Sequence, residues 1–279
     1  MHAGWNLLAR RQCAEVTFIG RMLVVTVVVL FAPAVTSEIL TRSITPLAWA
    51  CVLGSGACCG VYYYSLARAY NSSEFTVVYP VARSLPVVLV ALGDVLRGRP
   101  LTSAAWIGAA LVVAGCVLAP LHSFREFSLG RYFHRASFWM GVTALGTVGY
   151  TLLDKVAQEN VRFGGPATAF RYSYMFFLVS WAAYWLARLG LGKPPECDEP
   201  VGWKTPVLGA VFNFGGYTLV VWSYQLARHA SYIVAFRQAS IIIGVALAFL
   251  IYRERGLLVR ITGTLIITAG LVLIALRGG

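Results

Sequence analysis

Tyr64-Ser65-Leu66-Ala67-Arg68 recurs in the second half of the chain as Tyr224-Gln225-Leu226-Ala227-Arg228. Each copy closes a long apolar segment, and weaker matches align the two halves along most of their length. In this alignment, Arg83 falls opposite Arg237. The sequence therefore predicts one structural unit that is present twice.

The composition is that of an integral membrane protein. Of the 279 residues, 58% are hydrophobic and 12% are charged, whereas a soluble domain carries about 25% charged residues. The formal charge of +12 would favour a nucleic-acid partner in a soluble protein. Here the Lys and Arg residues gather in short connections between apolar runs, as the charges that set membrane topology do. We therefore expect a multi-pass protein of a cell membrane. Its partner is the lipid bilayer, and we expect it to bind no nucleic acid.

Ten apolar segments follow one another, most of them near the ~20 residues that cross a bilayer. We expect spans at 1–11, 16–36, 46–68, 75–96, 101–121, 136–156, 165–188, 203–228, 231–252 and 257–276. The expected fold is an all-α polytopic membrane protein, with a first repeat at 1–121, a connecting loop at 122–135 and a second repeat at 136–279. Because five crossings is an odd number, the second repeat starts from the opposite face. Such inverted repeats place substrate sites near the midplane.

The first span is shorter than its counterpart. Gly4 lies almost at the N-terminus, whereas Gly149, which matches it, has most of an expected helix before it. The favoured interpretation is a start site assigned too far downstream, and the alternative is a half-length first helix. The orientation of the chain in the membrane also stays open. The positive-inside rule places the termini outside, whereas the resemblance described next implies termini in the cytoplasm.

Several short motifs resemble the EamA family of the drug/metabolite transporter superfamily. His2-Ala3-Gly4-Trp5-Asn6 is similar to the HAxWN ending of the first helix in one branch. The segment from Val234-Ala235-Phe236-Arg237-Gln238 to Tyr252-Arg253-Glu254-Arg255 is similar to the signature of the second repeat. The chain departs from the family at Gly98-Arg99, where Gly-Glu is usual. The resemblance implies a ten-helix carrier that exports small metabolites.

Two arginines are the strongest candidates for a substrate site. Arg83 lies about 13 Å along its expected helix and Arg237 about 9 Å along its own, at 1.5 Å per residue. Charge inside a membrane is costly and marks substrate pathways. Guanidinium groups hold carboxylates and phosphates in bidentate fashion, so the pair predicts an anionic group on the substrate. The alternative is that carbonyls or a helix-end carboxylate neutralise each arginine, which then only fixes helix packing.

Further polar and aromatic residues are candidates for the lining of the substrate site. They are His2, Trp5, Asn6, Tyr79, Tyr150, Asn213, Tyr217, Trp222 and Gln238. Each alone is more often a packing residue than a ligand contact. Arg21 and Arg171 lie near the starts of their expected helices, so we expect them to reach the membrane interface.

Recurring glycines predict close contacts between helices. They are Gly56 and Gly60, which form a GxxxG motif, and the matching pairs Gly108 with Gly115 and Gly263 with Gly270.

The sequence contains none of the common catalytic or metal-binding motifs. HExxH, GxSxG and CxxC patterns are absent, so we expect neither an enzyme nor a metal or other cofactor. The carboxylates of Asp94, Asp154, Glu159 and Glu254 fall at expected helix ends, which weakens the case for proton coupling through a buried acid. Asp94 and Arg97 are three residues apart and are expected to pair at the end of one helix.

The resulting expectation is a secondary transporter that moves a small anionic or zwitterionic metabolite, such as an exported amino acid, by alternating access. One alternative is a flippase for a lipid or lipid-linked sugar, because arginines also suit phosphate head groups. A second is a membrane scaffold subunit that uses its glycine faces to bind partners. A membrane-embedded enzyme is the least favoured. A homodimer is one expected assembly.

Overall fold

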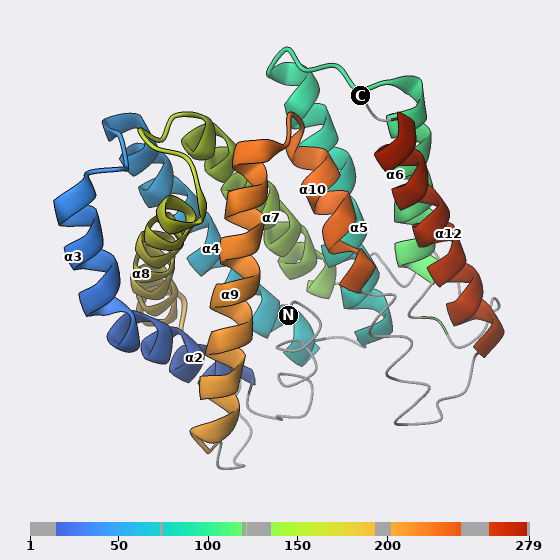
Figure 1. Cartoon of the computed structure of the whole chain (residues 1–279). Coiled ribbons are helices and arrows are strands. Elements are labelled where there is room, and N and C mark those ends of the chain that lie inside the picture. The colour runs from blue at the N-terminus through green and yellow to red at the C-terminus, as the bar shows by residue number, and fades with distance from the viewer. Residues whose placement is uncertain are drawn as a thin grey trace. The chain divides into compact units, whose positions relative to one another are not determined.

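The computed structural model describes residues 15–72, 75–118, 121, 135–192, 202–240 and 257–277 (Figure 1). Ten helices follow one another in these segments, and no strand occurs among them. They are α2 (Glu15–Val29), α3 (Phe31–Thr41), α4 (Pro46–Ser72), α5 (Phe75–Leu96), α6 (Ser103–Leu118), α7 (Arg135–Glu159), α8 (Pro166–Leu191), α9 (Lys204–Leu226), α10 (Ala230–Arg237) and α12 (Leu257–Arg277). The predicted all-α polytopic class is confirmed.

Three of the described helices are long and apolar enough to cross a membrane by themselves. They are the Pro46–Ala69 part of α4, then α8 and α9. The pair α2 and α3 makes a fourth candidate if its two helices are one broken span. The predicted first span lies outside the described residues, as does most of the span predicted at 231–252.

The span expected at 16–36 is bent and reaches Thr41. The axes of Thr17–Val29 and Phe31–Thr41 differ by 51°, and Figure 1 shows the bend between α2 and α3. Pro33 explains the position, because it has no N–H to donate to the carbonyl of Val29 one turn earlier. Hydropathy predicts an apolar segment here, but it does not indicate that the helix is broken within that segment.

The described helices form two compact units. Unit 1 comprises Met1–Asn71 and Gly149–Arg228, and unit 2 comprises Ser72–Val148 and His229–Gly279. Each unit therefore combines segments from both halves of the sequence. Compact unit and sequence repeat are different divisions of this chain, and the division into repeats at 1–121 and 136–279 stays a prediction.

In unit 1, the glycines of α4 face α8 at short range. A Cβ atom on Gly56 would lie 2.6 Å from Cβ of Val179, and one on Gly60 would lie 2.5 Å from Cβ of Ala183. Real Cβ atoms do not approach so closely, so a larger residue at either position would push the helices apart.

In unit 2, α6 and α12 lie side by side through their glycines (Figure 1). A Cβ atom on Gly108 would lie 2.8 Å from the carbonyl oxygen of Gly270, and one on Gly115 would lie 2.6 Å from that of Gly263. The close partners here include backbone atoms, which cannot move aside as a side chain can.

A buried ion pair joins α3 to α8 within unit 1. The Nε atom of Arg171 lies 3.3 Å from Oε2 of Glu38, and both side chains are less than one-tenth exposed. Arg171 also donates to the hydroxyls of Ser43, Ser37 and Thr168 at 3.0, 3.0 and 2.9 Å. Glu38 and three hydroxyls thus hold the guanidinium of Arg171 inside the protein, and the expectation that it reaches the membrane interface stays a prediction. Arg21 lies over the ring of Trp203, 4.9 Å from its centroid.

Asp94 connects α5 to the start of α10 in unit 2. Its carboxylate is fully buried and accepts from the backbone N–H groups of Ala230 and Ser231 at 3.2 and 2.9 Å, and from the Ser231 hydroxyl at 2.7 Å. Arg97 lies 3.8 Å away, so the predicted helix-end pair is confirmed. The carboxylate also caps a second helix, where the first N–H groups need acceptors and favour negative charge.

Candidate functional site

A fully buried carboxylate stands among the helices of unit 1. Asp154 of α7 has no exposed surface. The Tyr172 hydroxyl on α8 donates to Oδ1 at 2.8 Å, and the Tyr217 hydroxyl on α9 donates to Oδ2 at 2.5 Å. Each carboxylate oxygen thus has a tyrosine from a different helix, and three helices position one acidic group.

A second layer of polar and aromatic groups surrounds these residues. The Ser55 hydroxyl of α4 lies 3.4 Å from that of Tyr172. Asn213 of α9 donates through Nδ2 to the hydroxyl of Tyr63 on α4 at 2.9 Å. The four helices α4, α7, α8 and α9 therefore share one buried polar cluster, which we call the Asp154 cluster; its members are Asp154, Tyr172, Tyr217, Ser55, Tyr63 and Asn213.

The sequence of α7 explains why polar groups collect on one side of it. Thr151, Asp154 and Gln158 are spaced by three and four residues, which places them on the same face of a helix, and all are buried. The Thr151 Oγ1 atom has no hydrogen-bond partner within the described part of the chain.

Three of the predicted site residues belong to this region. Tyr217 and Asn213 are members of the Asp154 cluster. Tyr150 is buried and packs edge-on against Tyr62 and Phe176, with ring centroids 5.9 and 6.0 Å apart. Trp222 lies farther along α9 and is partly exposed.

The first-helix candidates His2, Trp5 and Asn6 lie outside the described residues. Tyr79 and Arg83 fall within the bounds of α5, but their side chains are also outside the described part. Arg237 ends α10, and Gln238 caps it. The Gln238 side chain is buried and donates to the carbonyl of Val234 at 3.3 Å.

Both predicted arginines therefore belong to unit 2, on helices α5 and α10, which contact each other. Three other candidates, Tyr150, Asn213 and Tyr217, belong to unit 1. The anion-binding role of Arg83 and Arg237 stays a prediction.

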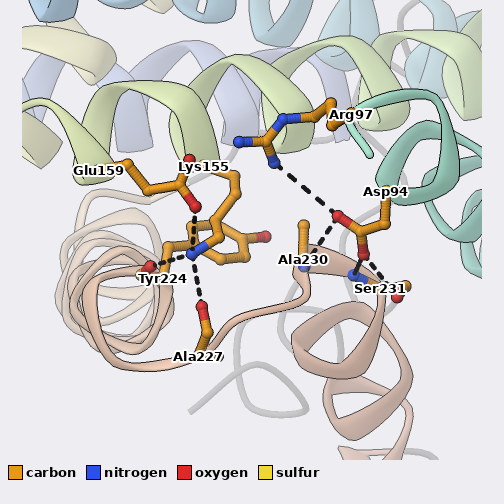
Figure 2. A network of polar contacts seen from close by, with 8 residues as sticks. All are labelled: Asp94, Arg97, Lys155, Glu159, Tyr224, Ala227, Ala230 and Ser231. Carbon is orange, nitrogen blue, oxygen red and sulfur yellow. Dashed lines mark hydrogen bonds and ion pairs between the residues drawn. The ribbon is translucent and has the colours of Figure 1, made fainter. Parts of the chain in front are cut away.

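Lys155 is a second buried ionisable residue of α7, and its partners are drawn in Figure 2. Its ammonium group donates to the carbonyls of Tyr224 and Ala227 at 2.7 and 2.5 Å and lies 2.9 Å from Oε1 of Glu159. These carbonyls belong to the C-terminal end of α9, where positive charge is favoured. Lys155 thus joins α7 to the end of α9. The contacts of Asp94 and Arg97 described for unit 2 appear in the same figure.

The sequence did not single out Asp154, Tyr172 or Tyr63. Asp154 falls near the end of α7 as expected. It is buried, whereas a carboxylate at a helix end is often exposed to water. The available signal was the spacing of Thr151, Asp154 and Gln158, which predicts a polar face on an otherwise apolar helix.

The buried ionisable groups and apolar helices define a multi-pass α-helical membrane protein. Residues 5–120 match the EamA-like transporter family, a family of the drug/metabolite transporter superfamily. The resemblance predicted from the motifs is therefore confirmed by the match over residues 5–120.

The fold agrees with that of a known structure. A solved structure described as "Crystal structure of protein" has a TM-score of 0.68 and 18% sequence identity, covering 99% of this chain and 93% of the other. At this identity the similarity concerns the fold alone. No curated protein matches the chain.

Proposed function

We propose that this chain is a secondary transporter of the cell membrane that moves a small anionic or zwitterionic metabolite by alternating access. The observation that carries the proposal is the Asp154 cluster. Ionisable residues inside a membrane are costly and mark substrate or ion pathways, and Asp154 is buried among the helices, where hydroxyls from two other helices hold it.

The two compact units also support this proposal. Alternating access in secondary transporters is largely a rigid-body movement of one bundle of helices against another around a binding site. A chain with two bundles, each drawn from both halves of the sequence, has the rigid bodies that such a mechanism uses.

Asp154→Asn is expected to lower transport by at least about tenfold, because a charge-assisted hydrogen bond contributes about 1.5–3 kcal/mol and 1.4 kcal/mol corresponds to tenfold in affinity. Counterflow of labelled amino and organic acids in vesicles that contain the purified protein measures this. Melting temperature in detergent checks that the variant is folded.

Glu159→Gln is the matched control, because it makes the same chemical change on the same helix and its amide oxygen can still accept from Lys155. We expect counterflow close to wild type. Equal losses in both variants would contradict a specific role for Asp154. Absence of counterflow for every compound in the wild type would contradict the proposed function itself.

Arg83→Gln and Arg237→Gln test the predicted anion site. Each is expected to raise the half-saturating concentration of a carboxylate-bearing substrate about tenfold, because bidentate charged hydrogen bonds are lost. Arg21→Gln, next to Trp203, is the control on an arginine outside the predicted site. Unchanged saturation curves for both site variants would remove the arginines from the binding site.

A further inference from the structure

We infer that one end of unit 1 binds the phosphate head group of an anionic membrane lipid through Arg42 and Arg162. This end is formed by the connection between α3 and α4 and the connection between α7 and α8. The inference goes beyond the proposed function and does not depend on it, because it concerns a lipid of the surrounding membrane and not the transported metabolite.

The first step is that hydrogen bonds hold the two connections together. The backbone N–H of Arg162 donates to the carbonyl of Ser43 at 2.9 Å. The hydroxyl of Thr45 donates to the carbonyl of Asn160 at 2.7 Å. The two connections therefore lie at the same end of unit 1 (Figure 1). Because Arg42 directly precedes Ser43 in the chain, its backbone is held close to that of Arg162.

The second step is the charge at this end of unit 1. Both arginine side chains are exposed, and neither guanidinium has a hydrogen-bond or ion-pair partner among the residues that the structure describes. The nearby carboxylates are already paired with other residues, Glu38 with Arg171 and Glu159 with Lys155. The two arginines therefore present positive charge that these carboxylates do not neutralise.

The third step is the backbone of Arg42. This residue ends α3 in the left-handed conformation, with φ 48° and ψ 48°. Glycine is usual at such a helix end, because a side chain disfavours the left-handed region. Among the described residues, Arg42 alone has a positive φ without being glycine. An arginine at a position that favours glycine indicates that its side chain has a role, since such backbone strain is concentrated at functional positions.

The fourth step is the apolar surface beside the arginines. Leu40, two residues before Arg42, is 83% exposed, and Phe163, which follows Arg162, is 54% exposed. In a membrane protein, such side chains contact acyl chains, while neighbouring arginines extend to the head groups. Guanidinium groups bind phosphate oxygens in bidentate fashion, and basic sites at the membrane surface attract anionic lipids. A lipid that carries both a phosphate and acyl chains matches both features, whereas a free phosphate matches only the arginines.

The test measures lipid binding to the purified full chain by native mass spectrometry. The probes are phosphatidylglycerol, phosphatidylcholine with the same acyl chains, and inorganic phosphate. We expect the wild type to bind the anionic lipid more tightly than the neutral one. Arg42→Gln and Arg162→Gln should each weaken binding of phosphatidylglycerol about fivefold, the loss expected for one basic residue at a membrane surface. Binding of phosphatidylcholine should stay close to wild type.

Two control variants separate lipid binding from a structural role. Arg188→Gln makes the same change near the opposite end of α8, and we expect its binding of phosphatidylglycerol to stay close to wild type. Arg42→Gly removes the side chain and favours the left-handed backbone. We therefore expect Arg42→Gly to keep or raise the melting temperature in neutral detergent while it weakens binding of phosphatidylglycerol.

Any of four results would overturn the inference. One is equal binding of phosphatidylglycerol and phosphatidylcholine to the wild type. Another is unchanged binding of phosphatidylglycerol when both arginines are replaced by glutamine. A third is an equal loss in Arg188→Gln, which would indicate attraction to the total charge of the chain. The last is binding of inorganic phosphate as tight as that of phosphatidylglycerol, which would make the ligand a free phosphate.

Discussion

Arg171→Met is expected to lower the free energy of unfolding by about 3–5 kcal/mol, the usual cost of removing one partner of a buried ion pair. The variant leaves the Glu38 carboxylate charged within unit 1, and its remaining donors among the described residues are the Ser43 hydroxyl and the backbone N–H of Ile44. It also removes the donor that the hydroxyls of Ser37 and Thr168 accept from. Denaturation with increasing SDS in mixed micelles measures the change.

Arg188→Met is the matched control on the same helix. Arg188 lies in the last turn of α8, where its guanidinium is 4.7 Å from the ring centroid of Trp185, and we expect a loss below about 1 kcal/mol at this more exposed position. Adding Glu38→Gln to Arg171→Met should recover part of the loss, because the unpaired charge is then gone. Equal effects of the two Arg→Met variants, or no recovery in the double variant, would show that the buried pair does not stabilise the fold.

The sequence could predict the helices because their signals are local. α5 runs from Phe75 to Leu96 as expected, since apolar runs and polar breaks lie next to each other along the chain. The break between α2 and α3 needed one further local signal, Pro33. Local patterns of this kind need no knowledge of how distant segments meet.

The candidate site could be predicted only in part, because its contacts are distant in sequence. Tyr172 and Tyr217 lie 18 and 63 residues after Asp154, and no repeat or motif links them to it. The same holds for Arg171, because its partner Glu38 lies on another helix and is distant from it in the sequence. The local sequence pattern identifies such residues only as charges near helix ends. Whether they are buried depends on which helices pack around them.

The neighbouring residues Asp154 and Lys155 are both buried, but their side chains have different kinds of partner. Lys155 is directed to the carbonyls of Tyr224 and Ala227 and to Glu159, so its charge is used to join α7 with the end of α9. Asp154 meets two hydroxyl groups, which are neutral donors. We therefore assign a structural role to Lys155, whereas the role of Asp154 in transport is the proposal that Asp154→Asn tests.

Gly115→Ala is expected to destabilise the protein by about 1–3 kcal/mol or more, which is the range for overpacked interiors. The new methyl group would lie 2.5 Å from Cγ1 of Ile267 and 2.6 Å from the carbonyl oxygen of Gly263. Ile267 can turn aside, but the carbonyl belongs to the backbone of α12, so α6 and α12 must separate. The separation also exposes their facing apolar side chains to lipid and loses close contacts that hold the pair together.

Gly141→Ala is the control for this prediction, because it makes the same change in a helix interior where, among the described residues and apart from the helix's own backbone, no atom lies within 4 Å of the new Cβ. At such an open position the helix propensity of alanine should stabilise the protein by up to about 1 kcal/mol. SDS denaturation of both variants should therefore give shifts of opposite sign. If Gly115→Ala also stabilises the protein, α6 and α12 have room between them, and their glycines serve helix flexibility and not close contact.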